Sequence, residues 1–169
     1  KRDKSRYLYV LAQLYSSQDN FALATEYFTK VIRTSPDYEM VFNAKINRAR
    51  SFDTSAGNSE AIIAELQKML KDDKNIEFLD VIYFGLAELN NRQNKLKTAI
   101  PLYEKSVSSS VKNDAQKALS SVILADIYYD QQNYRPAQAY YDTAVAFMDP
   151  NNQRYKNAQQ KKVTLTELI

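Results

Sequence analysis

Alanines recur along the chain in pairs, and the two members of each pair stand twelve residues apart. Successive pairs follow one another at intervals of 37 or 38 residues. The pairs are Ala12 and Ala24, Ala49 and Ala61, Ala87 and Ala99, and Ala125 and Ala137. Four pairs that keep one phase indicate four copies of a single structural unit.

Large side chains keep the same phase as the alanines. They stand three residues after the first alanine and four residues after the second. The first set is Tyr15, Phe52, Asn90 and Tyr128, and the second is Phe28, Glu65, Tyr103 and Tyr141. Spacings of three and four place these residues on one face of a helix, so each unit is predicted to be two amphipathic helices around a turn. The tyrosines of both sets are predicted to fill the core rather than to stack on sugars or bases.

Two places interrupt the pattern. The second unit has charged residues at three positions that are apolar elsewhere: Arg48, Glu65 and Lys68. Its second helix fits the pattern better one residue later, with Ile62, Leu66 and Met69 facing the core. In the third unit Pro101 would remove a backbone hydrogen bond, so the helix there should start near residues 96–98 or kink.

Polar residues and prolines mark where the helices should start. Asn20 and Asn133 stand in equivalent turns just before an aromatic residue, as N-caps do. Residues 35–37, Ser-Pro-Asp, predict a serine cap, a proline at the first helical position and an acid in the first turn. Asp149 and Pro150 are predicted to begin a further helix in the same way.

Composition narrows the possible functions. The chain has 169 residues, with 23 basic and 20 acidic side chains that give a net charge of +3, too little for a nucleic-acid-binding face. Histidine and cysteine are absent, and two glycines cannot build a phosphate-binding loop. We therefore expect neither an enzyme nor a metal or cofactor site. No apolar run is long enough to span a membrane. The start without methionine or a signal peptide suggests a segment of a larger protein.

The repeating unit resembles the tetratricopeptide repeat, a family whose pattern is Leu, a small residue and Tyr, then Ala, an aromatic residue, a small residue and Pro. The first unit carries this pattern as Leu8, Leu11, Ala12, Tyr15, Ala24, Phe28, Val31 and Pro36, and the fourth as Leu124, Ala125, Tyr128, Ala137, Tyr141 and Ala144. The resemblance implies an all-α, right-handed α–α superhelix. Four helix pairs would lie within residues 1–150, at approximately 5–38, 39–75, 76–113 and 114–149. A helix over residues 150–169 would cap or continue them.

In this family the first helix of each pair lines a concave groove that holds a partner protein or peptide. The corresponding residues here are Tyr9, Gln13, Ile46, Arg50, Phe84, Glu88, Val122 and Asp126. We expect Phe84 to be the central anchor, because the adjacent Gly85 would leave space beside the ring, and Arg50 and Glu88 to set the partner's charge. The groove lacks the Lys and Asn residues with which chaperone-binding relatives hold a terminal carboxylate, which argues against that ligand. The C-terminal helix could instead fill this groove.

The expected function is a non-catalytic protein–protein interaction scaffold. The tyrosine-rich stretch at residues 127–145 resembles the repeat region of large Bacteroidetes envelope lipoproteins of the SprE/PorW type, which serve gliding motility and type IX secretion. That resemblance implies a periplasm-facing part of a cell-envelope protein, with any lipid anchor outside these residues. The alternative is a glycan-binding module of an outer-membrane nutrient-uptake lipoprotein, in which exposed tyrosines would stack on sugars.

Overall fold

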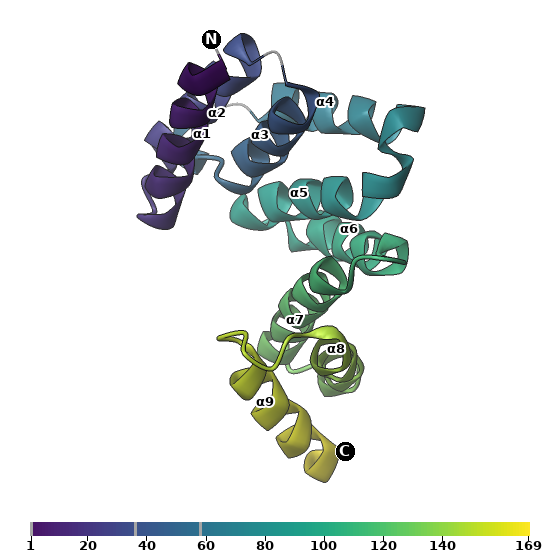
Figure 1. The fold of residues 1–169 in the computed structure, drawn as a ribbon. Coiled ribbons are helices and arrows are strands. Elements are labelled where there is room, and N and C mark those ends of the chain that lie inside the picture. The colour runs from purple at the N-terminus through teal and green to yellow at the C-terminus, as the bar shows by residue number, and fades with distance from the viewer. Residues whose placement is uncertain (1, 36, 58) are drawn as a thin grey trace. The chain divides into compact units, whose positions relative to one another are not determined.

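The chain folds into α-helices throughout. The computed structural model describes residues 2–35, 37–57 and 59–169, and within these ranges it contains no strand. The helices are α1 (Arg2–Ser17), α2 (Phe21–Thr34), α3 (Tyr38–Arg50), α4 (Glu60–Leu70), α5 (Leu79–Arg92), α6 (Leu96–Ser109), α7 (Asp114–Asp130), α8 (Tyr134–Phe147) and α9 (Tyr155–Leu168) (Figure 1). Short 3-10 turns, η1 (Thr54–Ala56) and η2 (Asp73–Phe78), flank α4. The prediction of an all-α fold with four helix pairs and a final helix is confirmed; the right-handed superhelix stays a prediction.

Two compact units divide the chain. Unit 1 comprises Lys1–Ile76 and Gly85–Ala99, and unit 2 comprises Glu77–Phe84 and Ile100–Ile169. The division therefore runs through α5 and α6, the helices of the third pair.

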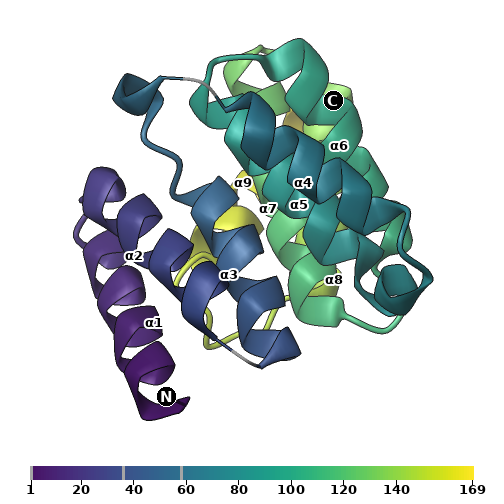
Figure 2. The same cartoon turned by 90° about the horizontal axis from the view of Figure 1, so that it is seen from above.

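The first helix pair is built around the alanines of the repeat. Ala12 and Ala24 are completely buried and form a cluster with Phe28, Val31 and Ala44 where α1, α2 and α3 meet. Both views show α1 and α2 side by side (Figures 1 and 2). Small side chains let the two helices approach this closely, and the rings beside them fill the remaining volume.

The first two helix starts show how local hydrogen bonds set the boundaries. The side chain of Asn20 accepts a hydrogen bond from the amide of Leu23 at 3.3 Å, which confirms the predicted cap of α2. The start of α3 differs from the prediction. Asp37, and not Ser35, is its N-cap, because the Asp37 carboxylate accepts from the amide of Met40 at 2.9 Å. The hydroxyl of Ser35 accepts from the amide of Asp37, and Pro36 lies outside the described residues.

The second helix pair packs in the shifted register. Helix α4 buries Ile62, Leu66 and Met69, which confirms the prediction for this helix. Ala61, in contrast, is exposed, so the alanine phase does not hold in α4. The shift of one residue gives the packing position to Ile62 and turns Ala61 toward solvent.

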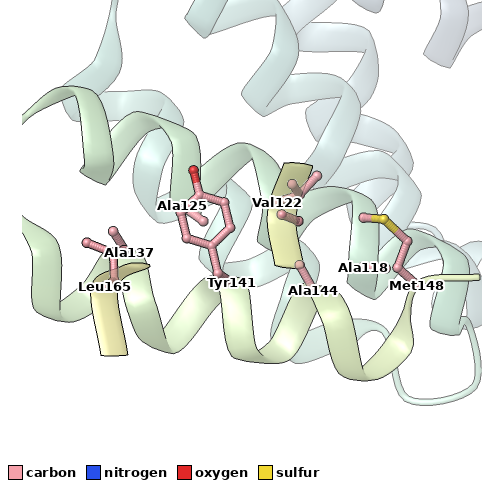
Figure 3. Packing of buried hydrophobic residues seen from close by; sticks show 9 residues of the cluster. Ala118, Val122, Ala125, Ala137, Tyr141, Ala144, Met148 and Leu165 are labelled. Carbon is pink, nitrogen blue, oxygen red and sulfur yellow. The ribbon is translucent and has the colours of Figure 1, made fainter. Parts of the chain in front are cut away.

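The fourth pair and the last helix form the core of unit 2. The cluster of nine buried residues comprises Tyr141, seven other residues of α7, α8 and α9, and Met148 just after α8. The ring of Tyr141 points from α8 toward Ala125 on α7 (Figure 3). Helix α9 contributes Ala158 and Leu165 to this cluster, so it covers one side of the fourth pair.

The start of α6 agrees with the prediction, whereas the start of α9 does not. Helix α6 begins at Leu96, as predicted, and Pro101 lies inside it. Asp149 and Pro150 do not begin α9, which starts at Tyr155. The Asp149 carboxylate instead accepts a hydrogen bond from the amide of Asn151 at 2.8 Å and closes a turn before the helix.

Candidate peptide-binding groove

The eight predicted groove residues fall into two classes according to their offset from the first alanine of the pair. Three residues before the alanine stand Tyr9, Ile46, Phe84 and Val122. Ile46, Phe84 and Val122 are buried in the core, and Tyr9 is half-buried. Side chains at this position of the repeat therefore point toward neighbouring helices rather than toward an open groove.

Phe84, the residue expected to anchor a partner, is not available at the surface. Its ring is 1% exposed and meets Tyr103 edge to face, with ring centroids 5.9 Å apart. The space expected beside Gly85 is also occupied. A Cβ atom added to Gly85 would lie 3.5 Å from Ile46 and 3.6 Å from Leu66. Phe84 thus lies in the core of unit 2 and does not line an open groove.

The residues one position after the alanine lie differently. Gln13, Arg50 and Glu88 come from the first helices of three successive pairs, and all three line one hollow in unit 1. The hollow has a volume of about 300 Å³. The rest of its wall is mostly polar and is formed by Ser16, Ser17, Phe28, Asn47 and Ser51.

Hydrogen bonds hold the wall of this hollow in place. The Asn47 amide nitrogen donates to the hydroxyl of Tyr9 at 2.9 Å, and Arg50 donates to the Asn47 oxygen at 3.4 Å. The hydroxyls of Ser16 and Ser51 lie 2.7 Å apart. Burial raises the pKa of Tyr9 more than its hydrogen bond to Asn47 and the charge of Arg50 lower it. Tyr9 therefore keeps its proton at neutral pH and serves as a neutral hydrogen-bonding group.

Asp126 occupies the equivalent position in unit 2, where the surroundings are different. It accepts hydrogen bonds from the hydroxyl of Tyr141 at 2.5 Å and from the Lys161 ammonium of α9 at 2.7 Å. Burial, followed by the bond to Asp126, raises the pKa of Tyr141 well above its usual value. At the fourth pair the C-terminal helix therefore occupies the place that the sequence assigned to a ligand.

The tyrosines largely contact one another. Tyr103 and Tyr141 are completely buried, as predicted. Tyr128 is half-buried and stacks on Tyr140 with ring centroids 5.8 Å apart, and both hydroxyls donate to Glu104. Burial, together with the Glu104 carboxylate, raises the pKa of Tyr128 to about 12. Rings that are engaged in this way offer little free face for stacking on a sugar.

A second hollow in unit 1 was not predicted. It has a volume of about 470 Å³ and opens between α3 and α4. Its wall includes Phe42, Ala61, Ala64 and Met69, with Lys68 as a charged member. The signal in the sequence was the second unit's departure from the pattern, because Ala61 and Ala64 do not face a core there.

Comparison with known proteins agrees with the two regular pairs. Residues 5–38 and 118–147 match the tetratricopeptide repeat family, and these segments correspond to the first and fourth helix pairs. No curated protein sequence matches the chain. Tetratricopeptide repeats mediate protein–protein interactions and typically form scaffolds rather than active sites. In the described part of the chain, no helix combines the length and apolar character that crossing a membrane requires.

Proposed function

We propose that the chain is a protein-interaction scaffold that binds an extended, polar segment of a partner protein in the 300 Å³ hollow of unit 1. The observation that carries the proposal is the convergence of Gln13, Arg50 and Glu88 from three separate helices on one concave surface. Surfaces of this kind, built from successive helix pairs, suit elongated ligands.

The chemistry of the wall defines the ligand. Side-chain amides such as those of Gln13 and Asn47 can both donate and accept hydrogen bonds, as a peptide backbone does. Arg50 and Glu88 add charged groups of both signs to the wall of the same hollow. Because Tyr9 and Asn47 already hold each other, the hollow is partly organised before a ligand arrives.

Peptide selection followed by titration tests this assignment. The full chain is used to select peptides from a displayed random library, and the recovered peptides are titrated by fluorescence anisotropy. The variant Gln13→Ala/Ser17→Ala alters two exposed residues of the hollow. We expect it to weaken binding at least about tenfold, which is about 1.4 kcal/mol. The control Gln67→Ala/Lys68→Ala alters two exposed positions on α4 and should leave the affinity unchanged.

The opposite pattern would move the binding site. If the α4 variant lost binding while the Gln13→Ala/Ser17→Ala variant kept it, the larger hollow between α3 and α4 would be the binding surface. Circular dichroism of both variants, with unchanged helical signal, excludes unfolding as the cause.

The cell-envelope setting is also a proposal, and it is supported by the tyrosine-rich stretch at residues 127–145. In a native host, an antibody against this chain should detect it after the outer membrane is permeabilised and should give no signal in the cytoplasmic fraction. Detection in the cytoplasm alone would contradict the envelope setting and would leave the scaffold proposal unaffected.

A further inference from the structure

Two tyrosine rings lie next to each other at the same positions of the repeat in the first and the fourth helix pairs. These positions come three residues after the first alanine and three residues after the second. The first pair has Tyr15 and Tyr27 there, and the fourth has Tyr128 and Tyr140. The ring centroids are 5.3 Å apart in the first pair and 5.8 Å apart in the fourth. All four side chains are half-buried, so the rings are also partly accessible from solvent.

A shared carboxylate distinguishes the two tyrosines of the fourth pair. Both hydroxyls donate to Oε1 of Glu104 on α6, that of Tyr128 at 3.1 Å and that of Tyr140 at 3.5 Å. Burial, together with the Glu104 carboxylate, raises the pKa of both phenols above the ordinary value. At neutral pH each phenol therefore keeps its proton, and that proton lies next to a base.

The two tyrosines of the first pair have no such base. In the described part of the chain, neither the Tyr15 nor the Tyr27 hydroxyl has a hydrogen-bond partner. The Lys30 ammonium instead lies 4.4 Å from the centre of the Tyr27 ring. A cation over a ring is attracted by the electrons of that ring, so it opposes the removal of one of them. The same ring pair thus occurs in one setting that favours one-electron oxidation and in another that opposes it.

Adjacent phenols beside a base can couple to dityrosine. Each phenol gives one electron to an oxidant and its hydroxyl proton to a base, here Glu104, which passes the proton to water. The two neutral phenoxyl radicals carry part of their unpaired electron on the ring carbons ortho to oxygen. Two ortho carbons form a bond, and their hydrogens move as protons to the phenolic oxygens. Two electrons and two protons are lost in total, and two equivalents of a one-electron oxidant, such as the oxidised haem of a peroxidase, are reduced.

We propose that Tyr128 and Tyr140 form a site of oxidative cross-linking, at which a one-electron oxidant joins α7 to α8 through dityrosine. The rings are already adjacent, so coupling within one chain is favoured over coupling between chains. Rotation of the two half-buried side chains brings the ortho carbons together. The chain has no cysteine, so dityrosine supplies a covalent link between helices that a disulfide cannot.

Photochemical oxidation of the full chain tests the proposal. Tris(bipyridine)ruthenium(II), visible light and persulfate generate the one-electron oxidant, and the reaction is stopped at low conversion. The monomer band from denaturing electrophoresis is digested with a protease that cleaves before aspartate, because an aspartate lies between the two tyrosines of each pair. Mass spectrometry then quantifies the linked peptides. We expect the link between Tyr128 and Tyr140 to form at least about fivefold faster than the link between Tyr15 and Tyr27.

Three variants separate the roles of the residues. Tyr128→Phe removes one reacting phenol and should abolish the link in the fourth pair. Glu104→Gln removes the base but keeps an acceptor of similar shape, so it should slow this link at least about fivefold and leave the link in the first pair unchanged. Tyr134→Phe is the matched control, because Tyr134 and Tyr129 have the same centroid separation of 5.8 Å but meet edge to face. It should leave the link between Tyr128 and Tyr140 unchanged. Circular dichroism shows whether the variants keep their helices.

Four results would overturn the proposal. The first is a link in the fourth pair that forms no faster than the link in the first pair, and the second is a rate that Glu104→Gln leaves unchanged. The third is the same rate in the urea-unfolded chain, because the fold would then not be what brings the two phenols together. The fourth is a product that consists of cross-linked dimers rather than linked monomers, in which exposed tyrosines such as Tyr7 have reacted first.

Discussion

The second and fourth helix pairs start from the same alanine phase but pack in different ways. In the fourth pair both alanines, Ala125 and Ala137, are completely buried, and the ring of Tyr141 fills the volume beside them. In the second pair Ala49 is buried, whereas Ala61 is exposed. The fourth pair, and not the second, matches the tetratricopeptide repeat family.

The difference depends on one position of the repeat. Glu65 stands in α4 where Tyr141 stands in α8, and it pairs with Arg48 and with Lys45, the latter at 3.2 Å. A carboxylate held by two cations cannot fill the volume that a ring would fill. Helices α3 and α4 accordingly approach each other less closely than α7 and α8, and the hollow of about 470 Å³ opens between them. Because α4 packs in the shifted register, the completely buried Leu66 takes the core position and Glu65 lines the hollow.

Removing the side chain at this shared position should separate the two pairs most clearly. Tyr141→Ala deletes a completely buried ring, and large aromatic truncations cost about 3–5 kcal/mol. Glu65→Ala deletes one partner of a partly exposed ion pair, so we expect a loss of about 1 kcal/mol or less. Urea denaturation followed by circular dichroism measures both values. Similar losses in the two variants would mean that the second pair depends on Glu65 as strongly as the fourth depends on its ring.

Enlarging the second alanine tests the same contrast by overpacking. Ala137 is completely buried between helices, so Ala137→Leu should lower the free energy of unfolding by about 1–3 kcal/mol. Ala61 is exposed at the equivalent position, and Ala61→Leu should change it by less than about 0.5 kcal/mol. Denaturation midpoints of the two variants give the comparison. A large loss from Ala61→Leu would show that α3 and α4 approach more closely in solution.

The fold was predictable wherever the alanine phase coincided with burial. Ala12, Ala24, Ala87 and Ala99 are all completely buried, so their spacing located the helix pairs correctly. Ala61 was misleading because alanine is small and only weakly apolar, and its identity does not show which face of a helix it occupies. The aliphatic residues of α4 carry more information, since burying them contributes more free energy.

The groove was only partly predictable, for a different reason. The periodicity of the first helices shows that Gln13 and Phe84 stand at different positions of the repeat. It does not show which of these positions faces open space. That depends on neighbouring elements, such as the ring of Tyr103 against Phe84 and the Lys161 ammonium against Asp126. Contacts between residues far apart in sequence are not encoded in a single helical face, so the two hollows of unit 1 needed the structure.

Alkaline pH should weaken the fourth pair selectively. Tyr128 and Tyr141 have pKa values raised above 10.0 in the fold, mainly by burial, so folding favours their neutral form. Their contribution to stability is complete below pH 10 and is lost as the pH rises through 10 toward 12, because the unfolded chain then releases protons more readily. Hydrogen exchange, corrected for its intrinsic pH dependence, should show α8 losing protection before α4. Tyr128→Phe should reduce the size of this loss, because one of the two groups with a raised pKa is removed.

Raising the salt concentration should weaken the second pair rather than the fourth, and this is the smallest of the expected effects. The second pair relies on the partly exposed cluster of Glu65 with Arg48 and Lys45, whereas the corresponding position of the fourth pair is filled by a ring. Raising the salt concentration to about 1 M shortens the screening length to about 3 Å. We therefore expect α4 to lose a few tenths of a kcal/mol in the free energy of local opening, while α8 is unchanged or slightly stabilised. Native-state hydrogen exchange at low and high salt measures both helices in one sample, and Glu65→Gln serves as the control because it removes the charge. If Glu65→Gln kept the full salt response of α4, charges outside this cluster would be responsible, and the second pair would not depend on the ion cluster.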